Sequence, residues 1–362
     1  MAHLRNPLQR IPSLDGLRAI SISLVLFGHI LAGRNIPYLS EYGFRDLGAL
    51  GVRVFFVISG FLITGLLLNE ISATGRINFK KFYFRRTLRI FPPFYFFLMV
   101  MLAASLSGLT NIPLESFVSA FTYTKNLFHP GEGLLGHSWS LSMEEQFYLA
   151  WPFVLFVTGR RRAHGLLWLI IVLCPLARIV GYLYVPTFKE NQSWITFGLI
   201  SNLDSIATGC LLAFMREWLH TWKPYRRVLE SALFALLPIF ILFAALPHHH
   251  PKVDFTIFTT GQNLAIALCL DWAITNSTGF VGKILNSKPF VWVGVLSYSL
   301  YLWQQVFLVP STNVFPLNII QTFAAALFSY FIIERPSLKL RQRLEKRPSI
   351  AALPNDSLLP NH

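Results

Sequence analysis

The chain of 362 residues is 54% hydrophobic and only 13% charged, and it carries a net charge of +14. An ordinary soluble domain has about 25% charged residues, so this composition argues against a large soluble enzyme, a disordered protein or a coiled coil. The lysines and arginines cluster in short loops between apolar runs, which is typical of a membrane protein and not of a nucleic-acid-binding one.

Ten apolar segments are long enough to cross a bilayer, whose hydrocarbon core of about 30 Å requires about 20 helical residues. They cover residues 16–34, 51–69, 87–107, 141–158, 165–185, 194–215, 229–246, 255–275, 290–309 and 317–334. The stretch 108–140 is predicted to be a long loop with a short interfacial helix. We therefore predict an all-α, polytopic transmembrane bundle of about ten helices, without a cleaved signal peptide.

The basic residues predict the orientation of the bundle. With ten crossings and a cytoplasmic N-terminus, 24 of the 31 lysines and arginines fall on the cytoplasmic side, and every cytoplasmic segment is basic. The positive-inside rule then predicts that both ends of the chain are cytoplasmic. Residues 1–340 are predicted to form the transmembrane domain, and residues 341–362 a tail that is basic at first and then disordered.

The first apolar segment contains Arg18 and His29, which are eleven residues apart. Eleven helical residues make three turns plus roughly 20°, so both side chains lie on one face, separated by about 16 Å along the axis. Arg18 is predicted near the cytoplasmic surface and His29 deep in the bundle, toward the outer half. A snorkelling arginine and a structural histidine explain the spacing equally well.

Three arginines, Arg85, Arg86 and Arg89, stand at the cytoplasmic start of the third segment. Arg85 and Arg89 share a helix face because they are four residues apart. The planar guanidinium group suits phosphate oxygens, so one interpretation is a phosphate-containing ligand. The other interpretation is an anchor for lipid headgroups, accompanied by interfacial aromatic residues.

The fourth segment opens with GHSWSLSMEEQFY, residues 136–148. Ser140 can cap this helix, and Glu144 and Glu145 can simply match the helix dipole. The two carboxylates point about 100° apart, so only one needs to face the interior. A carboxylate beside His29 would fix the tautomer of that ring, and we predict such a His–Glu pair for proton transfer.

Other ionisable residues lie within apolar segments, where each costs roughly 2.5–3.5 kcal/mol at the helix centre unless it faces a partner or a cavity. Asp204 and Asp271 lie in the sixth and eighth segments, and Glu334 ends the tenth. Each is explained as a buried structural partner, for example of Arg178. No cysteine spacing typical of a metal site occurs, and the histidine run 248–250 is interpreted as a solvated loop, with metal binding as the alternative.

Taken in this order, the motifs resemble those of the acyltransferase-3 family of integral membrane acyltransferases, over about residues 11–336. The similar stretches are LDGLRA from residue 14 with His29, GVRVFFVISGFLIT from 51, the arginine-rich stretch 82–95, HSWSLSMEEQFYLAWP from 137, SYSLYLW from 297, and ERP from 334. The most specific is the stretch from His137. Arg53 stands where the family often has Asp, and Gln304 stands where it often has His.

The resemblance implies an O-acyltransferase of the bacterial inner membrane that moves an acyl group from acyl-CoA, with acetyl-CoA the expected donor, to a hydroxyl of a carbohydrate or lipid-linked glycan. It implies no bound cofactor, no metal and no nucleic-acid partner. The implied roles are His29 as the catalytic base oriented by Glu144 or Glu145; donor binding by Arg18, Arg85, Arg86 and Arg89; and acceptor or oxyanion contacts by His137, Trp139, Ser140 and Ser142.

Two other functions fit the same residues. Intramembrane histidine and carboxylate groups could form the proton relay of a transporter or flippase. Against that alternative, the sequence shows no inverted repeat and no paired broken helices. A non-catalytic assembly or lipid-binding membrane protein is the second alternative.

Overall fold

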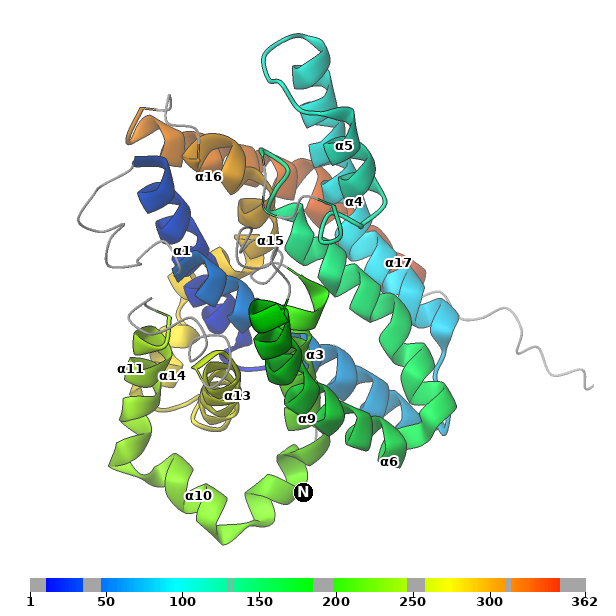
Figure 1. Cartoon of the computed structure of the whole chain (residues 1–362), viewed down its shortest axis with the longest axis vertical. Coiled ribbons are helices and arrows are strands. Elements are labelled where there is room, and N and C mark those ends of the chain that lie inside the picture. Colours follow the sequence, from blue (N-terminus) through cyan, green and yellow to red (C-terminus); the bar gives the residue numbers. More distant parts are fainter. Residues whose placement is uncertain are drawn as a thin grey trace, which may run out of the picture.

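A computed structural model describes residues 11–34, 47–128, 131, 133–184, 198–245, 258–309 and 314–345. In these residues the chain forms helices and turns and no strand, which confirms the all-α prediction (Figure 1). The principal helices are α1 (Leu14–Arg34), α3 (Leu47–Thr74), α4 (Phe79–Leu106), α5 (Leu114–Phe121), α6 (Ser138–Tyr184), α9 (Leu199–Thr221), α10 (Lys223–Glu230), α11 (Leu236–Phe243), α13 (Thr259–Thr275), α14 (Phe280–Leu285), α15 (Lys288–Leu308), α16 (Leu317–Ser329) and α17 (Arg335–Glu345).

Several of these helices are long and apolar enough to cross a membrane. Within the described residues they are α1, α3, α4, α6 and the continuous stretch from α16 through a π-helical turn, Tyr330–Glu334, into α17. The chain is therefore a multi-pass membrane protein, while the count of ten crossings stays a prediction. The predicted loop 108–140 does contain a short helix, α5, whose Leu114 and Phe121 are exposed.

Helix α6 is broken in its middle. Its 47 residues would span about 70 Å if straight, more than twice the bilayer core. At Gly159 the backbone leaves the helical region with φ of 70°, a conformation that glycine adopts without steric cost. The chain turns sharply there, at the lower right of Figure 1. The break lies between the predicted segments 141–158 and 165–185.

The centre of the bundle is held by helices that approach through glycines. A Cβ atom built on Gly60 of α3 would lie 2.1 Å from the Ile206 carbonyl oxygen of α9, and one on Gly209 would lie 2.0 Å from the Val57 carbonyl oxygen. Gly294 of α15 is equally close to the backbone of α1. Such contacts let membrane helices pack backbone against backbone. Helix α3 thereby becomes the central element, against which α1 and α9 pack.

Buried ion pairs join α9 to α6 and to α13. Arg178 of α6 donates two hydrogen bonds to Asp204 of α9, at 3.2 and 2.8 Å, which confirms the predicted pairing. Asp271 of α13 accepts from Arg216 at 2.5 Å and from Tyr225 at 2.7 Å. Both carboxylates are completely buried, so each needs these partners to offset the loss of water.

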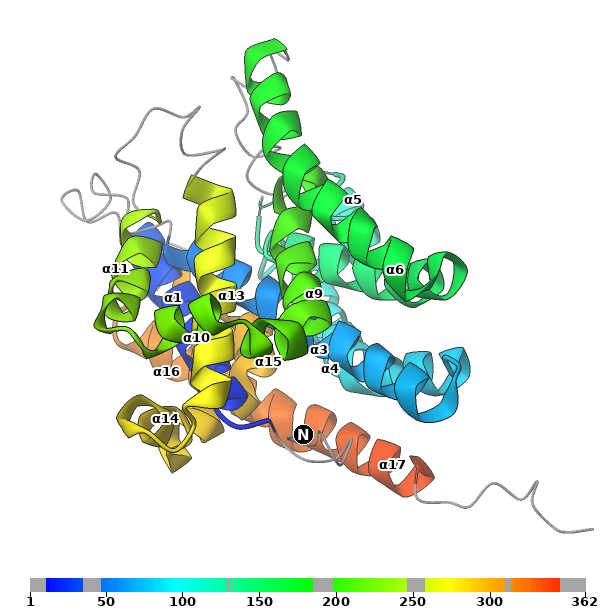
Figure 2. The ribbon, with the colours of Figure 1, turned by 90° about the horizontal axis from the view of Figure 1, so that it is seen from below.

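Helix α17 continues past the boundary predicted at residue 340. Residues 341–345, which the sequence assigned to the basic tail, are helical and lie along α4. Ser337 donates to the Leu88 carbonyl, and Arg85 donates to Glu345 at 2.8 Å. Figure 2 shows α17 at the lower edge of the molecule. The predicted disorder beyond residue 345 lies outside the described residues.

The glycine contacts predict a sharp difference between two positions of α3. Gly60→Ala should destabilise the protein by about 1–3 kcal/mol, because the new methyl group overlaps the α9 backbone. Gly65→Ala should be neutral or stabilising by about 0.5–1 kcal/mol, because nothing lies within 4 Å of a Cβ atom there and alanine favours the helix. Thermal unfolding of the full chain in detergent measures both, and equal midpoints would contradict the packing.

Candidate active site

A cavity of about 770 Å³, the main cavity, opens among α1, α3, α4, α6, α15 and α17. Charged side chains of both signs line it. The basic ones are Arg18, Lys81, Arg85, Arg86, Arg89 and Arg341, and the acidic ones are Asp15, Glu70, Glu144, Glu145 and Glu345. All four arginines and both glutamates singled out in the sequence therefore meet in one place, although they come from three helices.

Arg86 brings buried, unpaired hydrogen-bond donors to the main cavity. Its guanidinium carbon lies 3.3 Å from the centroid of the Tyr148 ring, in a cation–π contact. Its Nε and Nη2 atoms are buried and have no hydrogen-bond partner in the described part of the chain. Buried unpaired donors of a charged group are costly. Two guanidinium donors are thus available to an anion that enters the cavity.

Glu144 and Glu145 both line the main cavity, although their side chains leave the helix in different directions. Glu144 lies within hydrogen-bonding reach of the hydroxyl groups of Ser59 and Tyr148, and it is close enough to Arg18 and Arg86 for attraction. The Ser59 and Tyr148 hydroxyls are also hydrogen-bonded to each other. The Glu144 carboxylate of α6 therefore stabilises the positive charges of Arg18 and Arg86.

His29 lies apart from the two glutamates. Its Nδ1 atom is 3.1 Å from the Val25 carbonyl oxygen one turn earlier in α1, and the side chain is partly exposed. Among the described residues it has no hydrogen bond to Glu144 or Glu145, and it does not line the main cavity. The structure thus supplies a backbone carbonyl, and no carboxylate, as the group that orients this imidazole.

His137 connects His29 to the inner end of the main cavity. The ring of His137 is buried against Phe97 and Tyr301, with centroids 5.5 and 5.6 Å away, and it is close enough to His29 for electrostatic repulsion. Tyr301 donates to the His137 carbonyl at 3.1 Å and shares a hydrogen bond with Ser140. Ser140 and Tyr301 both line the main cavity. Contacts therefore lead from the cavity through Ser140 and Tyr301 to His137, and His29 lies near His137.

The other predicted acceptor residues have structural contacts. Trp139 packs edge-on against Phe56, with centroids 5.9 Å apart. The Ser142 hydroxyl donates to the Ser138 carbonyl at 2.9 Å and accepts from the Lys125 amide at 3.2 Å. Both side chains are buried. They shape the start of α6, and neither lines the main cavity.

The two departures from the family pattern have different surroundings. Arg53 donates to the Gln262 side-chain oxygen at 2.6 Å, so it bridges α3 and α13. Gln304 is completely buried, and neither atom of its amide has a hydrogen-bond partner in the described residues. Arg53 therefore makes a structural contact between two helices, whereas Gln304 has a buried amide group without a partner in the described residues.

Some cavity residues were missed by the sequence reasoning. Tyr148 lies one turn after Glu144 and could have been found from that spacing. Ser59 lies within the glycine-containing second segment and carries no distinguishing local signal. Arg341 and Glu345 were assigned to a tail because their segment is polar. Among the described residues there is no cluster of three or more His, Cys, Asp or Glu side chains that could hold a metal ion.

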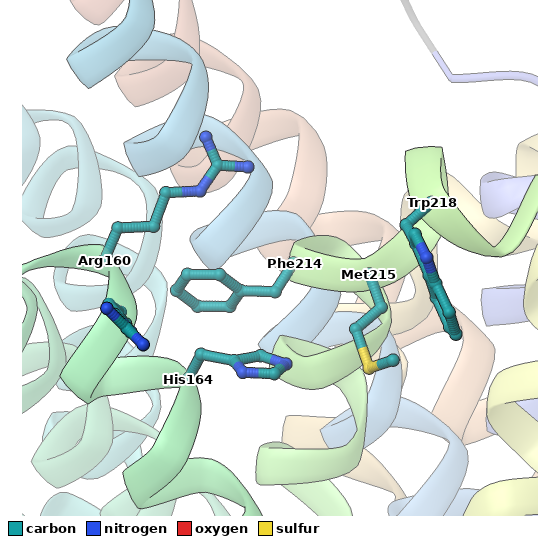
Figure 3. Close-up of a pocket in the computed structure, with 6 residues that line it drawn as sticks. Arg160, His164, Phe214, Met215 and Trp218 are labelled. Carbon is teal, nitrogen blue, oxygen red and sulfur yellow. The ribbon is translucent and has the colours of Figure 1, made fainter. Parts of the chain in front are cut away.

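A second, smaller pocket of about 420 Å³ lies where α6 resumes after Gly159 and meets α9 (Figure 3). It is lined by Arg160, Arg161, His164, Phe214, Met215 and Trp218. The rings of His164 and Phe214 are 5.8 Å apart, centroid to centroid. Arginine and tryptophan together are typical of a membrane–water interface. None of the residues that the sequence singled out lines this α6–α9 pocket.

The family model described as an acyltransferase domain, that of the acyltransferase-3 family, matches residues 11–333. The chain belongs to the acyltransferase-3 family. The match covers every helix that lines the main cavity except α17. The resemblance found in the sequence motifs is thereby confirmed.

The chain is similar to several curated proteins over most of its own length. It is 29% identical over 365 residues to the peptidoglycan O-acetyltransferase OatA of Listeria monocytogenes, covering 91% of this chain and 56% of that protein. It is 27% identical over 368 residues to the O-acetyltransferase OatA of Staphylococcus aureus, covering 91% and 57%. The chain thus spans little more than half the length of these relatives. No solved structure matches it.

The unpaired donors of Arg86 predict that the main cavity binds small polyanions. Inorganic pyrophosphate at ten times its dissociation constant should stabilise the full chain by about 1.4 kcal/mol, or roughly 2 °C in the unfolding midpoint. Arg86→Ala should lose most of this increase. Arg160→Ala, which removes an arginine of the α6–α9 pocket, is the matched control and should retain it. An equal response of all three proteins would contradict the prediction.

Proposed function

We propose that this chain is a membrane O-acyltransferase that transfers an acetyl group from acetyl-CoA to a hydroxyl group of a carbohydrate acceptor. The observation that carries the proposal is an arginine-lined cavity, with unpaired guanidinium donors, in a member of the acyltransferase-3 family. The names of two relatives, both O-acetyltransferases, support the reaction type.

The donor enters through the main cavity in this proposal. Its phosphate groups bind Arg85, Arg86 and Arg89, with Arg18 deeper along α1, because planar guanidinium groups pair with phosphate oxygens through two parallel hydrogen bonds. Glu144 and Glu145 hold this cluster in place by partly neutralising it. Acetyl-CoA is a substrate here and is released as coenzyme A after each turnover.

The acetyl group then passes beyond the inner end of the cavity to the imidazoles. The distance along α1 from Arg18 to His29 is about 16 Å, which an extended pantetheine arm can span. Ser140 and Tyr301 line this route, and His137 and His29 lie beyond them. The thioester carbon is thus placed beside His29, while the phosphates stay with the arginines.

His29 acts as the general base. When its Nδ1–H donates to the Val25 carbonyl, Nε2 is left as the proton acceptor. Nε2 takes the proton of the acceptor hydroxyl, the oxygen forms an ester bond with the acetyl carbon, and the carbon–sulfur bond breaks. The imidazolium returns its proton to the coenzyme A thiolate. Ser140 and Tyr301 line the cavity on this route, and a hydroxyl group that turns away from the His137 carbonyl donates to the developing oxyanion.

The acceptor approaches from the end of the bundle opposite to the arginines. One relative is named for peptidoglycan, so we propose a carbohydrate or lipid-linked glycan that contacts His137 and the start of α6, with Trp139 and Ser142 shaping that region. The protein is proposed to lie in the bacterial inner membrane, with the donor in the cytoplasm and ten crossings that leave both ends of the chain there.

The proposed topology can be tested by cysteine labelling in a variant without the three native cysteines. Ser107→Cys, in the turn after α4, should react with a membrane-impermeant maleimide in intact cells because that turn is predicted outside. Thr221→Cys, at the end of α9, should react only after the membrane is permeabilised. Labelling of both positions in intact cells, or the reverse pattern, would contradict ten crossings with cytoplasmic ends.

His29→Ala tests the reaction itself. With full-length protein in lipid nanodiscs and labelled acetyl-CoA, the wild type should transfer label to soluble glycan oligomers, and His29→Ala should lose at least ~100-fold in rate, as expected for a general base. His164→Ala, in the α6–α9 pocket, should transfer label at the wild-type rate. Folding is checked by the unfolding midpoint of each protein.

The outcome also separates the alternatives. Full activity in His29→Ala would refute its role as base while leaving the reaction in place. A wild type that moves solute across vesicles without transferring label would instead support a transporter. A wild type that does neither would support a non-catalytic membrane protein and contradict the proposed function.

A further inference from the structure

Helix α17 contributes to the main cavity although the family match ends before it. The match covers residues 11–333, whereas α17 begins at Arg335. Two of its side chains, Arg341 and Glu345, nevertheless line the cavity beside the arginines of α4. The rim of the cavity is therefore completed by a segment outside the matched domain.

The two side chains meet the α4 arginines through one shared carboxylate. Arg85 Nε donates to Glu345 Oε1 at 2.8 Å, and Arg341 Nε lies 3.6 Å from the same oxygen. The Glu345 side chain is only 14% exposed, against 33% for Arg85. The carboxylate thus lies between two guanidinium groups, in the position that an anionic oxygen of a ligand would take.

One face of α17 is directed at α4. Ser337, Arg341 and Glu345 recur every fourth residue, so they share a face. Ser337 anchors it by donating to the Leu88 carbonyl. Arg343, on the same helix, is exposed and lies outside the cavity. The contact is therefore specific to one side of a short polar helix.

The charges around Glu345 explain why a carboxylate lies among these arginines. Arg341 is close enough to Arg85, Arg86 and Arg89 for mutual repulsion, and Glu345 offsets it. Carboxylate and phosphate oxygens compete for the same guanidinium donors, and a phosphate offers more charge and more acceptor oxygens. A phosphate-containing ligand can therefore replace Glu345 without leaving the arginines unpaired.

We propose that Glu345 occupies the place of a donor phosphate on Arg85 in the unliganded protein, and that Arg341 becomes a further donor-binding residue once Glu345 is displaced. This inference rests on the proposed function, since it takes the donor to be an acyl-CoA. Helix α17 then affects donor affinity in two ways. Glu345 competes with the donor phosphate, and Arg341, one turn away, binds it.

The test measures coenzyme A binding to the full chain in lipid nanodiscs by titration calorimetry. Glu345→Gln removes the competing charge and should tighten binding by about 3–10-fold. Arg341→Ala removes a ligand and should weaken binding by about 5–10-fold. Pantetheine, which lacks the nucleotide phosphates, should bind all three proteins equally, because neither side chain then meets a phosphate.

The matched controls are Arg343→Ala, on the exposed face of α17, and Glu115→Gln, on α5. Both should bind coenzyme A as the wild type does. If α17 is only a structural clamp, Glu345→Gln loosens it and weakens binding, which is opposite in sign to the expectation.

The outcomes test this inference separately from the proposed function on which it rests. A wild type that binds coenzyme A, with unchanged or weaker binding in Glu345→Gln, overturns the inference and leaves the proposed function standing. Binding in Arg341→Ala equal to the wild type also overturns it. A wild type that binds no coenzyme A overturns both together.

Discussion

The cost of leaving a charged group unpaired away from water determines where the polar side chains of this protein lie. Arg178 and Asp204 satisfy each other across two helices, and Asp271 is held by Arg216 and Tyr225. Glu334 accepts from Ser299 at 2.7 Å. Against this background the unpaired Nε and Nη2 atoms of Arg86 are an exception. This exception lies in the main cavity, and it is the observation on which the proposed donor site rests.

Much of the site could be predicted from the sequence because helical spacing is regular. Arg85 and Arg89 share a face, and Glu144 and Glu145 follow Ser140 on one helix, so their meeting required only that the third and fourth segments be neighbours. The partner of His29 could not be predicted. Either a carboxylate on another helix or the carbonyl one turn earlier could accept a hydrogen bond from its ring. Which of the two does so depends on the distance between α1 and α6 at the level of His29.

Two helices extend beyond the boundaries that hydropathy predicted, and each extension has a physical reason. Helix α4 begins at Phe79, eight residues before the predicted segment, because Asn78 caps it by accepting from the Lys81 amide at 3.0 Å. The arginines therefore belong to a helix and are held rigidly. Residues 335–345 were missed in the same way, since hydropathy detects apolar length, whereas α17 is stabilised by a single polar face against α4.

Three polar side chains, His29, His137 and Gln304, bear on which group takes up the proton in the proposed reaction. Gln304 stands where the family often has His, and its buried amide can donate and accept hydrogen bonds but cannot take up a proton. In the proposed reaction, the proton acceptor is therefore one of the two imidazoles, His29 or His137. His137 is enclosed by Phe97 and Tyr301, whereas His29 keeps partial exposure and an oriented ring. In the proposed mechanism, this balance of access and orientation favours His29 as the base.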